Sequence, residues 1–120
     1  MHTFINFSNH PVANWDSLQK KEAYRLAGTN IIKDIAFPQI APEMTINEIR
    51  TLAEKYVGEI KKYSPSLVMC QGEFTLCYNV VRLLKAEGIK VVAACSKRMV
   101  EETEDGQKIV TFKFEQFREY

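Results

Sequence analysis

The sequence predicts a three-layer α/β domain with a mostly parallel sheet and a C-terminal antiparallel hairpin. Short apolar runs typical of strands alternate with segments of helical periodicity, and this alternation indicates parallel strands joined by right-handed crossovers. Pro and Gly punctuate the boundaries between these segments. Near the C-terminus, Asp105-Gly106 is a strong hairpin turn signal, and apolar and polar residues alternate after it.

The first half of the chain begins with a strand, a helix and a second strand. The apolar run 3–8 predicts the first strand. Either Asn14 or Asp16 can cap the helix that follows, and Gly28 suits its left-handed C-terminal position. The β-rich run 30–37 then predicts the second strand.

The second helix has the clearest periodicity in the chain. The segment 45–48 reads Thr-Ile-Asn-Glu, a capping-box pattern that predicts where this helix begins. We expect Pro65 to stop the helix and the apolar run 66–70 to form a strand buried on both faces. The apolar residues that recur at three- and four-residue steps are Ile46, Ile49, Leu52, Ala53, Tyr56, Val57 and Ile60.

The third helix is expected over 74–87, with Gly88 closing it. Its apolar residues cover more than one face, which predicts burial on two sides and favours a subunit contact in a homodimer. The run 89–95 predicts the fourth strand, a basic loop is expected over 96–98, and a hairpin completes the chain.

Composition bounds the class of protein. The chain has 120 residues, of which 46% are hydrophobic and 26% charged, so we expect one globular domain over 1–120. A net charge of +1 disfavours capture of duplex nucleic acid or a membrane surface. No apolar run approaches the roughly 20 residues of a membrane span.

An odd cysteine count favours the reducing cytoplasm. Three Cys and two His without ligand spacing predict neither a metal nor a cofactor.

Three polar segments follow strands of the predicted parallel sheet, and ligands bind at the carboxyl ends of such strands. The first holds a hydroxyl, an amide and an imidazole at Ser8, Asn9 and His10. An imidazole titrates near neutrality and can transfer protons. The alternative is a turn in which Ser8 and Asn9 bond their own backbone.

The second segment, 71–75, reads Gln-Gly-Glu-Phe-Thr and joins a buried strand to a helix. Gly72 permits close approach of a ligand, and free N–H groups at a helix start favour anions. Glu73 can bond ribose hydroxyls or complement the helix dipole. The third segment, Ser96-Lys97-Arg98, can neutralise a phosphodiester. The alternatives are a capped tight turn and a solvated basic turn.

These segments resemble those of a known family. FINFSNHP (4–11), VMCQGEF (68–74) and AACSKR (93–98) resemble the corresponding strand ends of the small CARF-like ring nucleases of type III CRISPR systems, which have a Rossmann-like domain. Two positions depart from the family pattern, because Asn9 is inserted between Ser8 and His10 and Glu73 replaces Asp.

The resemblance implies a homodimer that binds a cyclic oligoadenylate, most simply cyclic tetra-adenylate, across its two-fold axis. It also implies metal-independent cleavage, in which a ribose 2′-hydroxyl attacks the adjacent phosphorus and leaves a 2′,3′-cyclic phosphate. We therefore expect catalysis to involve His10, Ser8 and Arg98, and the ligand to contact Asn9, Gln71, Gly72, Glu73, Phe74, Thr75, Ser96 and Lys97.

Three other interpretations remain open at this point. A non-catalytic sensor or sponge for the same ring would have nearly the same sequence, since positioning alone separates binding from cleavage. An unrelated Rossmann-like enzyme acting on a mononucleotide or a nucleotide-sugar is a second. A pure interaction domain, with all three segments structural, is the third.

Overall fold

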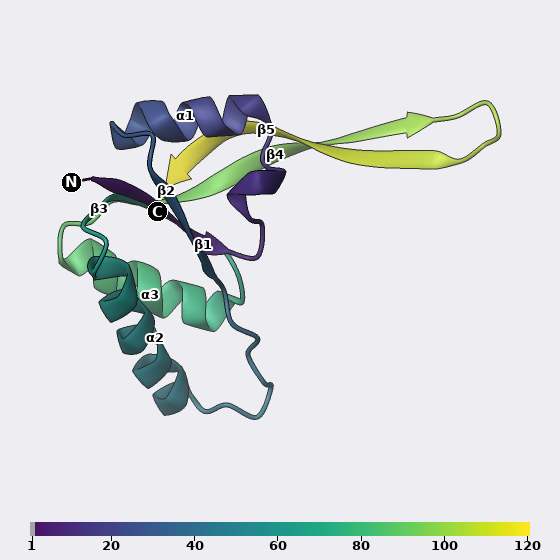
Figure 1. Cartoon of the computed structure of the whole chain (residues 1–120). Helices are drawn as coiled ribbons and strands as arrows, with labels where there is room; N and C mark the ends of the chain where they lie inside the picture. Colours follow the sequence, from purple (N-terminus) through teal and green to yellow (C-terminus); the bar gives the residue numbers. More distant parts are fainter. Residues whose placement is uncertain (1) are drawn as a thin grey trace.

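The computed structural model, described for residues 2–120, has a single five-stranded sheet with strand order β2-β1-β3-β4-β5 (Figure 1). The first four strands are parallel, and β5 runs antiparallel to β4. The predicted fold class is therefore confirmed. The strands are β1 (Thr3–Ser8), β2 (Ile32–Ala36), β3 (Pro65–Cys70), β4 (Val91–Glu102) and β5 (Lys108–Glu119), and the helices are α1 (Ser17–Ala27), α2 (Ile46–Lys61), α3 (Phe74–Ala86) and the short 3-10 helix Val12–Asn14.

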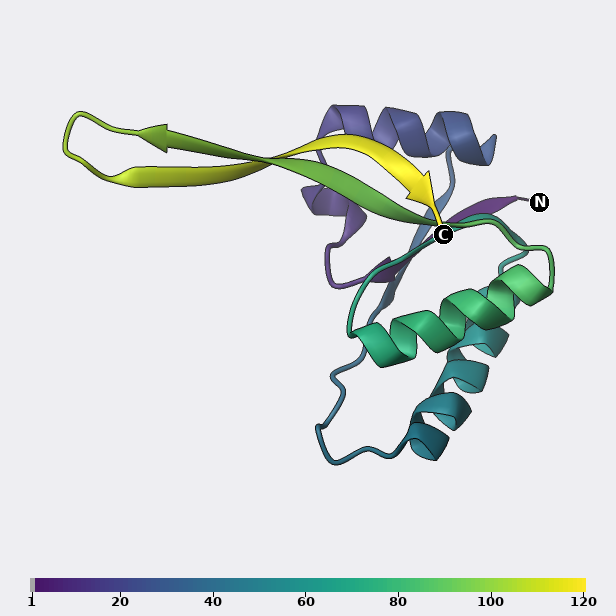
Figure 2. The same cartoon turned by 180° about the vertical axis from the view of Figure 1, so that it is seen from behind.

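Helices cover both faces of the sheet. Figures 1 and 2 show α1 on one face and α2 with α3 on the other. Within β1, Phe4 packs into the core beneath α1, whereas Ile5 and Phe7 belong to the core beneath α2 and α3. All six residues of β1 are buried, as expected for a central strand covered on both sides.

The helix ends follow from local signals. The Thr45 side chain accepts from the Glu48 N–H while Glu48 bonds back to the Thr45 N–H, so the predicted capping box is confirmed. Asp16 caps α1, and Asn14 instead lies in the 3-10 helix. Pro65 does not stop α2, which ends earlier; it is the first residue of β3, where a missing N–H is tolerated.

Both buried sides of α3 are covered within this chain. Its buried residues pack against α2 and the sheet, in one core with Ile49, Val57 and Val68. The predicted two-sided burial is confirmed, and a subunit contact is not needed to explain it. Phe74 and Tyr78 lie on the remaining, exposed side of the helix.

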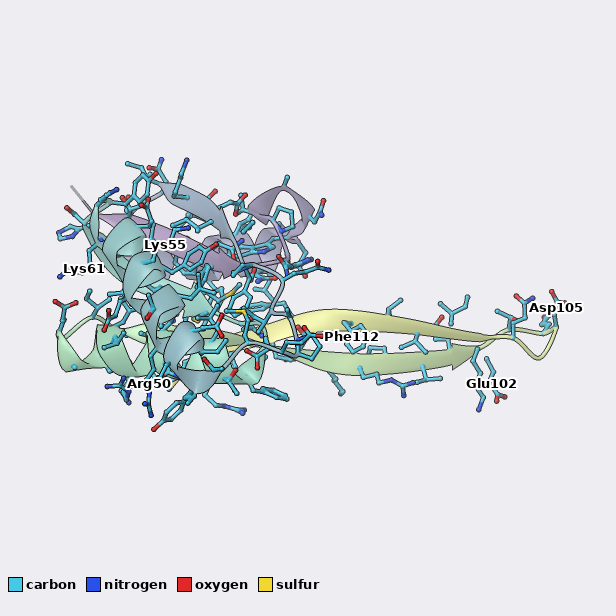
Figure 3. All side chains as sticks on the ribbon, turned by 90° about the horizontal axis from the view of Figure 1, so that it is seen from below. Arg50, Lys55, Lys61, Glu102, Asp105 and Phe112 are labelled. Atoms are coloured by element: carbon cyan, nitrogen blue, oxygen red, sulfur yellow. The ribbon has the colours of Figure 1, made fainter. Side chains whose placement is uncertain are left out.

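The C-terminal hairpin is much longer than the sequence predicts. β4 and β5 continue beyond the sheet as a two-stranded arm that projects away from the helices (Figures 1 and 3). The predicted turn is confirmed, since Gly106 has φ of 76° and its N–H donates to the Thr103 carbonyl. Among the described helices, none combines the length and apolar character that crossing a bilayer requires.

The expected basic loop over 96–98 is wrong. Ser96, Lys97 and Arg98 lie inside β4 and pair with residues 112–114 of β5. A register shift between Cys95 and Ser96 marks where the strand leaves the body of the molecule. Such a bulge bends a strand and lets pairing continue in a new direction, so polar residues here indicate an exposed ribbon and not a loop.

Candidate ligand site at the carboxyl edge of the sheet

A polar cavity opens where the strand order reverses. The chain passes from β1 to β2 on one side and crosses back to β3 on the other, so β1 and β3 flank a topological switch point. β3 and β4 pair only at Val68–Val91 and Met69–Val92 and then separate. The cavity there has a volume of about 450 Å³ and is lined by Ser8, Asn9, His10, Gln19, Met69, Gln71, Gly72, Ala94 and Ser96.

All three predicted segments reach this cavity, but not with all their residues. The six that line it are Ser8, Asn9, His10, Gln71, Gly72 and Ser96. The five predicted residues that do not are Glu73, Phe74, Thr75, Lys97 and Arg98. The strand-end rule therefore leads to this cavity, and the structure brings together six of the eleven predicted residues there.

Ser8 holds the first loop in shape. Its Oγ donates to Asn6 Oδ1 at 2.6 Å and accepts from the His10 N–H at 3.1 Å. Trp15 Nε1 donates to the His10 carbonyl at 2.9 Å, and Asn6 Nδ2 donates to the same oxygen at 2.9 Å. The backbone of His10 is thus fixed while its side chain is exposed at the cavity.

Asn6, in β1, supports this loop, and the sequence analysis did not single it out. It is buried within β1, and its Nδ2 also donates to Asp34 Oδ1 at 2.8 Å. Asp34 Oδ1 accepts the Val12 N–H at 3.2 Å as well, which connects β2 to the loop. The available signal was an amide in the middle of an apolar strand, two residues before Ser8 and so on the same face.

Gln71 joins β3 to β4 where their backbones separate. Its Oε1 accepts from the Ala94 N–H at 2.9 Å, and its Nε2 donates to the Ala94 carbonyl at 3.3 Å. A Gln amide has two donors and two acceptor positions. Half of this capacity holds the two strands together, and the other half is left for a ligand.

Gln19 contributes a second amide, from α1. The residue is only 5% exposed, and it lines the cavity. Its backbone N–H bonds Asp16, but its side-chain amide makes no hydrogen bond within residues 2–120. The amide nitrogen and oxygen both remain accessible to solvent, so both are free to bond a ligand in the cavity. The available signal was a polar residue on the same face of α1 as Ala23 and Ala27.

Glu73 removes the anion site expected at the start of α3. Its carboxylate accepts the N–H groups of Thr75 at 2.8 Å and Leu76 at 2.9 Å, and the Thr75 hydroxyl as well. Limited burial works against ionisation, but these hydrogen bonds outweigh it and lower the pKa of Glu73. The helix N-terminus already holds an anion, so it repels a phosphate.

Gly72 is required by packing. A Cβ at this position would lie 2.5 Å from ring atoms of Phe37, which is buried against Phe7. The sequence assigned Gly72 to ligand approach, and it does line the cavity. The close contact with Phe37 is a second and independent reason for glycine.

The basic residues lie outside the cavity. Lys97 and Arg98 are exposed on the arm and pair with Lys113 and Phe112 across the ribbon. In the part of the chain that the structure describes, no Lys or Arg side chain lines the cavity. Stabilisation of a phosphoryl charge by Lys97 and Arg98 of the same copy is therefore not supported, and His10 is the titratable group at the cavity.

Two cysteines lie behind the site in the core beneath α3. Cys70 Sγ and Cys77 Sγ are 3.5 Å apart, and the Tyr120 hydroxyl donates to the Cys70 carbonyl at 2.7 Å. The contact with Cys77 and burial raise the pKa of Cys70, while the contact with Cys70 lowers the pKa of Cys77. Residues 2–120 contain no cluster of three or more His, Cys, Asp or Glu suited to a metal ion.

Fold and cavity together define an α/β protein with a neutral, amide-lined pocket at its switch point. The chain belongs to the Uncharacterized protein MJ1673 family, whose model matches residues 2–118. Searches among curated proteins and among solved structures found no match.

Proposed function

We propose that this protein binds a cyclic oligoadenylate, represented most simply by cyclic tetra-adenylate, with one nucleotide unit in each cavity. The observation that carries the proposal is the convergence of segments 8–10, 71–72 and Ser96 on one cavity. These are the same strand ends whose sequences resemble CARF-like ring nucleases. In that role the protein, in the cytoplasm, would lower the concentration of the messenger in type III CRISPR antiviral signalling.

The polar lining suits a base and a ribose better than a phosphate. Gln19 offers an unbonded amide, and Gln71 offers half of one, so both can bond the edge of an adenine or a sugar hydroxyl. A cavity of about 450 Å³ lies within the range of small-molecule pockets. A ring of four nucleotides exceeds one such cavity, which favours a homodimer that offers two.

Cleavage of the ring would need no external nucleophile. The ribose 2′-oxygen attacks the adjacent phosphorus, the bond from phosphorus to the 5′-oxygen breaks, and a 2′,3′-cyclic phosphate remains. His10 can accept the proton of the 2′-hydroxyl or return one to the leaving 5′-oxygen. The bonds from Ser8, Asn6 and Trp15 fix the His10 backbone, which helps to orient its imidazole.

One observation favours a non-catalytic binder as the second candidate. Across residues 2–120, the cavity has no lysine or arginine to stabilise charge on the phosphoryl oxygens. A sponge needs only affinity for the ring, and amides alone can provide it. Slow cleavage or none is therefore expected to distinguish this protein from an efficient nuclease.

Incubation with radiolabelled cyclic tetra-adenylate in EDTA, with products resolved by chromatography, tests the proposal. We expect binding and a slowly formed 2′,3′-cyclic phosphate product. His10→Ala should slow cleavage by about 100-fold or more and leave affinity nearly unchanged. His2→Ala is the matched control and should behave as wild type.

The outcomes separate the candidates. A ring that is bound but never cut establishes the sponge. Binding of AMP in place of the ring supports a mononucleotide enzyme and contradicts the proposal. Binding of neither ligand at ~100 μM would contradict the proposal.

A further inference from the structure

One face of the arm is apolar at its centre and uncovered. The arm face is the side of the ribbon that continues outward from Ser96 and Phe114, and Phe114 is buried in the core beneath α1. Exposure is 70% for Phe112, 47% for Val100 and 42% for Val110. Three cross-strand pairs make up the arm face: Arg98 with Phe112, Val100 with Val110, and Glu102 with Lys108.

The arm lacks the support that stabilises a ribbon in water. A two-stranded hairpin alone is marginally stable and needs a further strand or a packed face. An exposed apolar cluster rimmed by charges is typical of a protein interface. The span 96–113 holds four basic and four acidic residues, so it has no excess charge to attract a nucleic acid or an anionic membrane.

The charges on the arm face are arranged to complement a second copy. Arg98 lies toward the root of the arm, Glu102 lies toward the tip, and Val100 lies midway between them along β4. A two-fold axis across the ribbon at the level of Val100 and Val110 reverses the second arm. That operation places Arg98 over the second copy's Glu102 and Phe112 over its Lys108, while the valines meet at the centre.

We propose that two copies of this chain pair through the arm face, with the arms antiparallel about this axis. The contact is isologous, since each half repeats the other. An ion pair, a cation–π contact and an apolar centre together match the common pattern of an interface with a charged rim. The pairing is derived from the arm alone, without reference to any ligand, and it places the two cavities at opposite ends of the contact.

The antiparallel arrangement also separates the two bodies. α1 stands on the same side of the sheet as the arm face, and the body lies at the root of the arm (Figures 1 and 3). Two arms that pointed the same way would bring both α1 layers together at the roots. Reversed arms keep the two bodies at opposite ends of the contact.

The opposite side of the ribbon is a poorer interface. Its pairs are Lys97 with Lys113, Met99 with Thr111 and Glu101 with Ile109. Two lysines stand directly across from each other at the root, and a single glutamate toward the tip cannot balance both. A threonine hydroxyl also occupies the centre, where the arm face has two valines.

Charge reversal with mixing tests the pairing. Arg98→Glu places like charges together in the homodimer, and so does Glu102→Arg. Each variant alone should raise the dimer dissociation constant about tenfold or more, measured by sedimentation equilibrium without ligand. An equimolar mixture restores both ion pairs, so native mass spectrometry should show the heterodimer in large excess over either homodimer.

Matched controls come from the other side of the ribbon. Lys97→Glu and Glu101→Lys change the same charges there and should leave the dissociation constant unchanged. Phe112→Gln should weaken the dimer without altering charge.

Wild type that stays monomeric at ~100 μM would overturn the proposal. A mixture that fails to recover the dimer would also overturn it. Control variants whose dimers dissociate as readily as that of Arg98→Glu would overturn it too. A protein that stays monomeric but binds the ring would overturn the arm pairing alone. A protein that forms the dimer but does not bind the ring would overturn only the proposed function.

Discussion

The two halves of β4 differ more than any two elements of this protein. Residues 91–95 lie between β3 and β5 in the body, where Val91 and Val92 are buried in the cores on opposite faces of the sheet. Residues 96–102 pair with β5 only and are exposed. Pairing continues through the bulge, but burial does not. The comparison teaches that hydrogen bonding alone makes a strand, whereas packing decides how much that strand contributes to stability.

The largest expected effect compares two phenylalanines on one face of β5. Phe114 is 3% exposed and Phe112 is 70% exposed, and they are two residues apart. Phe114→Ala should lower the free energy of unfolding by about 3–5 kcal/mol, because it opens a cavity beneath α1. Phe112→Ala should change it by less than about 0.5 kcal/mol in the monomer.

Urea denaturation at a concentration low enough to exclude dimers measures both values. Equal losses for the two variants would show that the arm is part of the cooperative core. A loss for Phe112→Ala that appears only at high concentration would instead report the proposed arm contact.

The second prediction concerns the polar network of the body, which the arm lacks. Asn6→Ala removes bonds to Ser8, His10 and Asp34 and should cost about 2 kcal/mol of unfolding free energy, since it leaves buried polar groups unpaired. Asn9→Ala, at an exposed position in the same loop, is the control and should be nearly neutral. Thermal unfolding that is the same for both variants would contradict the structural importance of this network.

The sequence predicted the body better than the arm for a physical reason. Alternation of buried runs and helical periodicity reflects burial, so it identified β1, α2 and β3 and predicted a candidate site at the carboxyl ends of the two strands. The side chains of an exposed ribbon are not buried, so the sequence of the arm carries no such pattern. Ser96, Lys97 and Arg98 therefore resemble a loop, although β5 pairs with each of them.

Within the site, local signals identified loops but not partners. The Gln71 amide bonds Ala94, which lies 23 residues away in the sequence. Gln19 reaches the cavity only because α1 packs over the sheet. Such assignments depend on tertiary contacts, which spacing along one chain does not encode. The capping residue Glu73 was open to either interpretation, and the geometry selects the cap.

The third prediction separates ligand binding from stability in the body. Gln19→Leu keeps the size of the side chain and removes an amide that bonds nothing in the described protein. Affinity for cyclic tetra-adenylate should fall about five- to tenfold, equivalent to roughly 1 kcal/mol, while stability stays equal or rises. Calorimetric titration measures the affinity, and Gln39→Leu at an exposed position is the control. An unchanged affinity would remove Gln19 from the ligand site.

The smallest expected effect is a difference in acid stability between a bonded carboxylate of the body and an unbonded one of the arm. Hydrogen bonds from Thr75 and Leu76 lower the pKa of Glu73 despite its limited burial. A group whose pKa falls on folding stabilises the folded state above its unfolded pKa, near 4.3, and loses that contribution as the pH falls through the folded value. Glu73→Gln should therefore cost about 0.5–1 kcal/mol at pH 7, and the gap from wild type should close below about pH 4. Glu104→Gln changes a carboxylate that bonds no described group, and it should leave the free energy of unfolding unchanged at pH 7. A gap for Glu73→Gln that persisted unchanged to pH 2 would show that the geometry of the side chain at the start of α3, and not its charge, determines how much this cap stabilises the folded state.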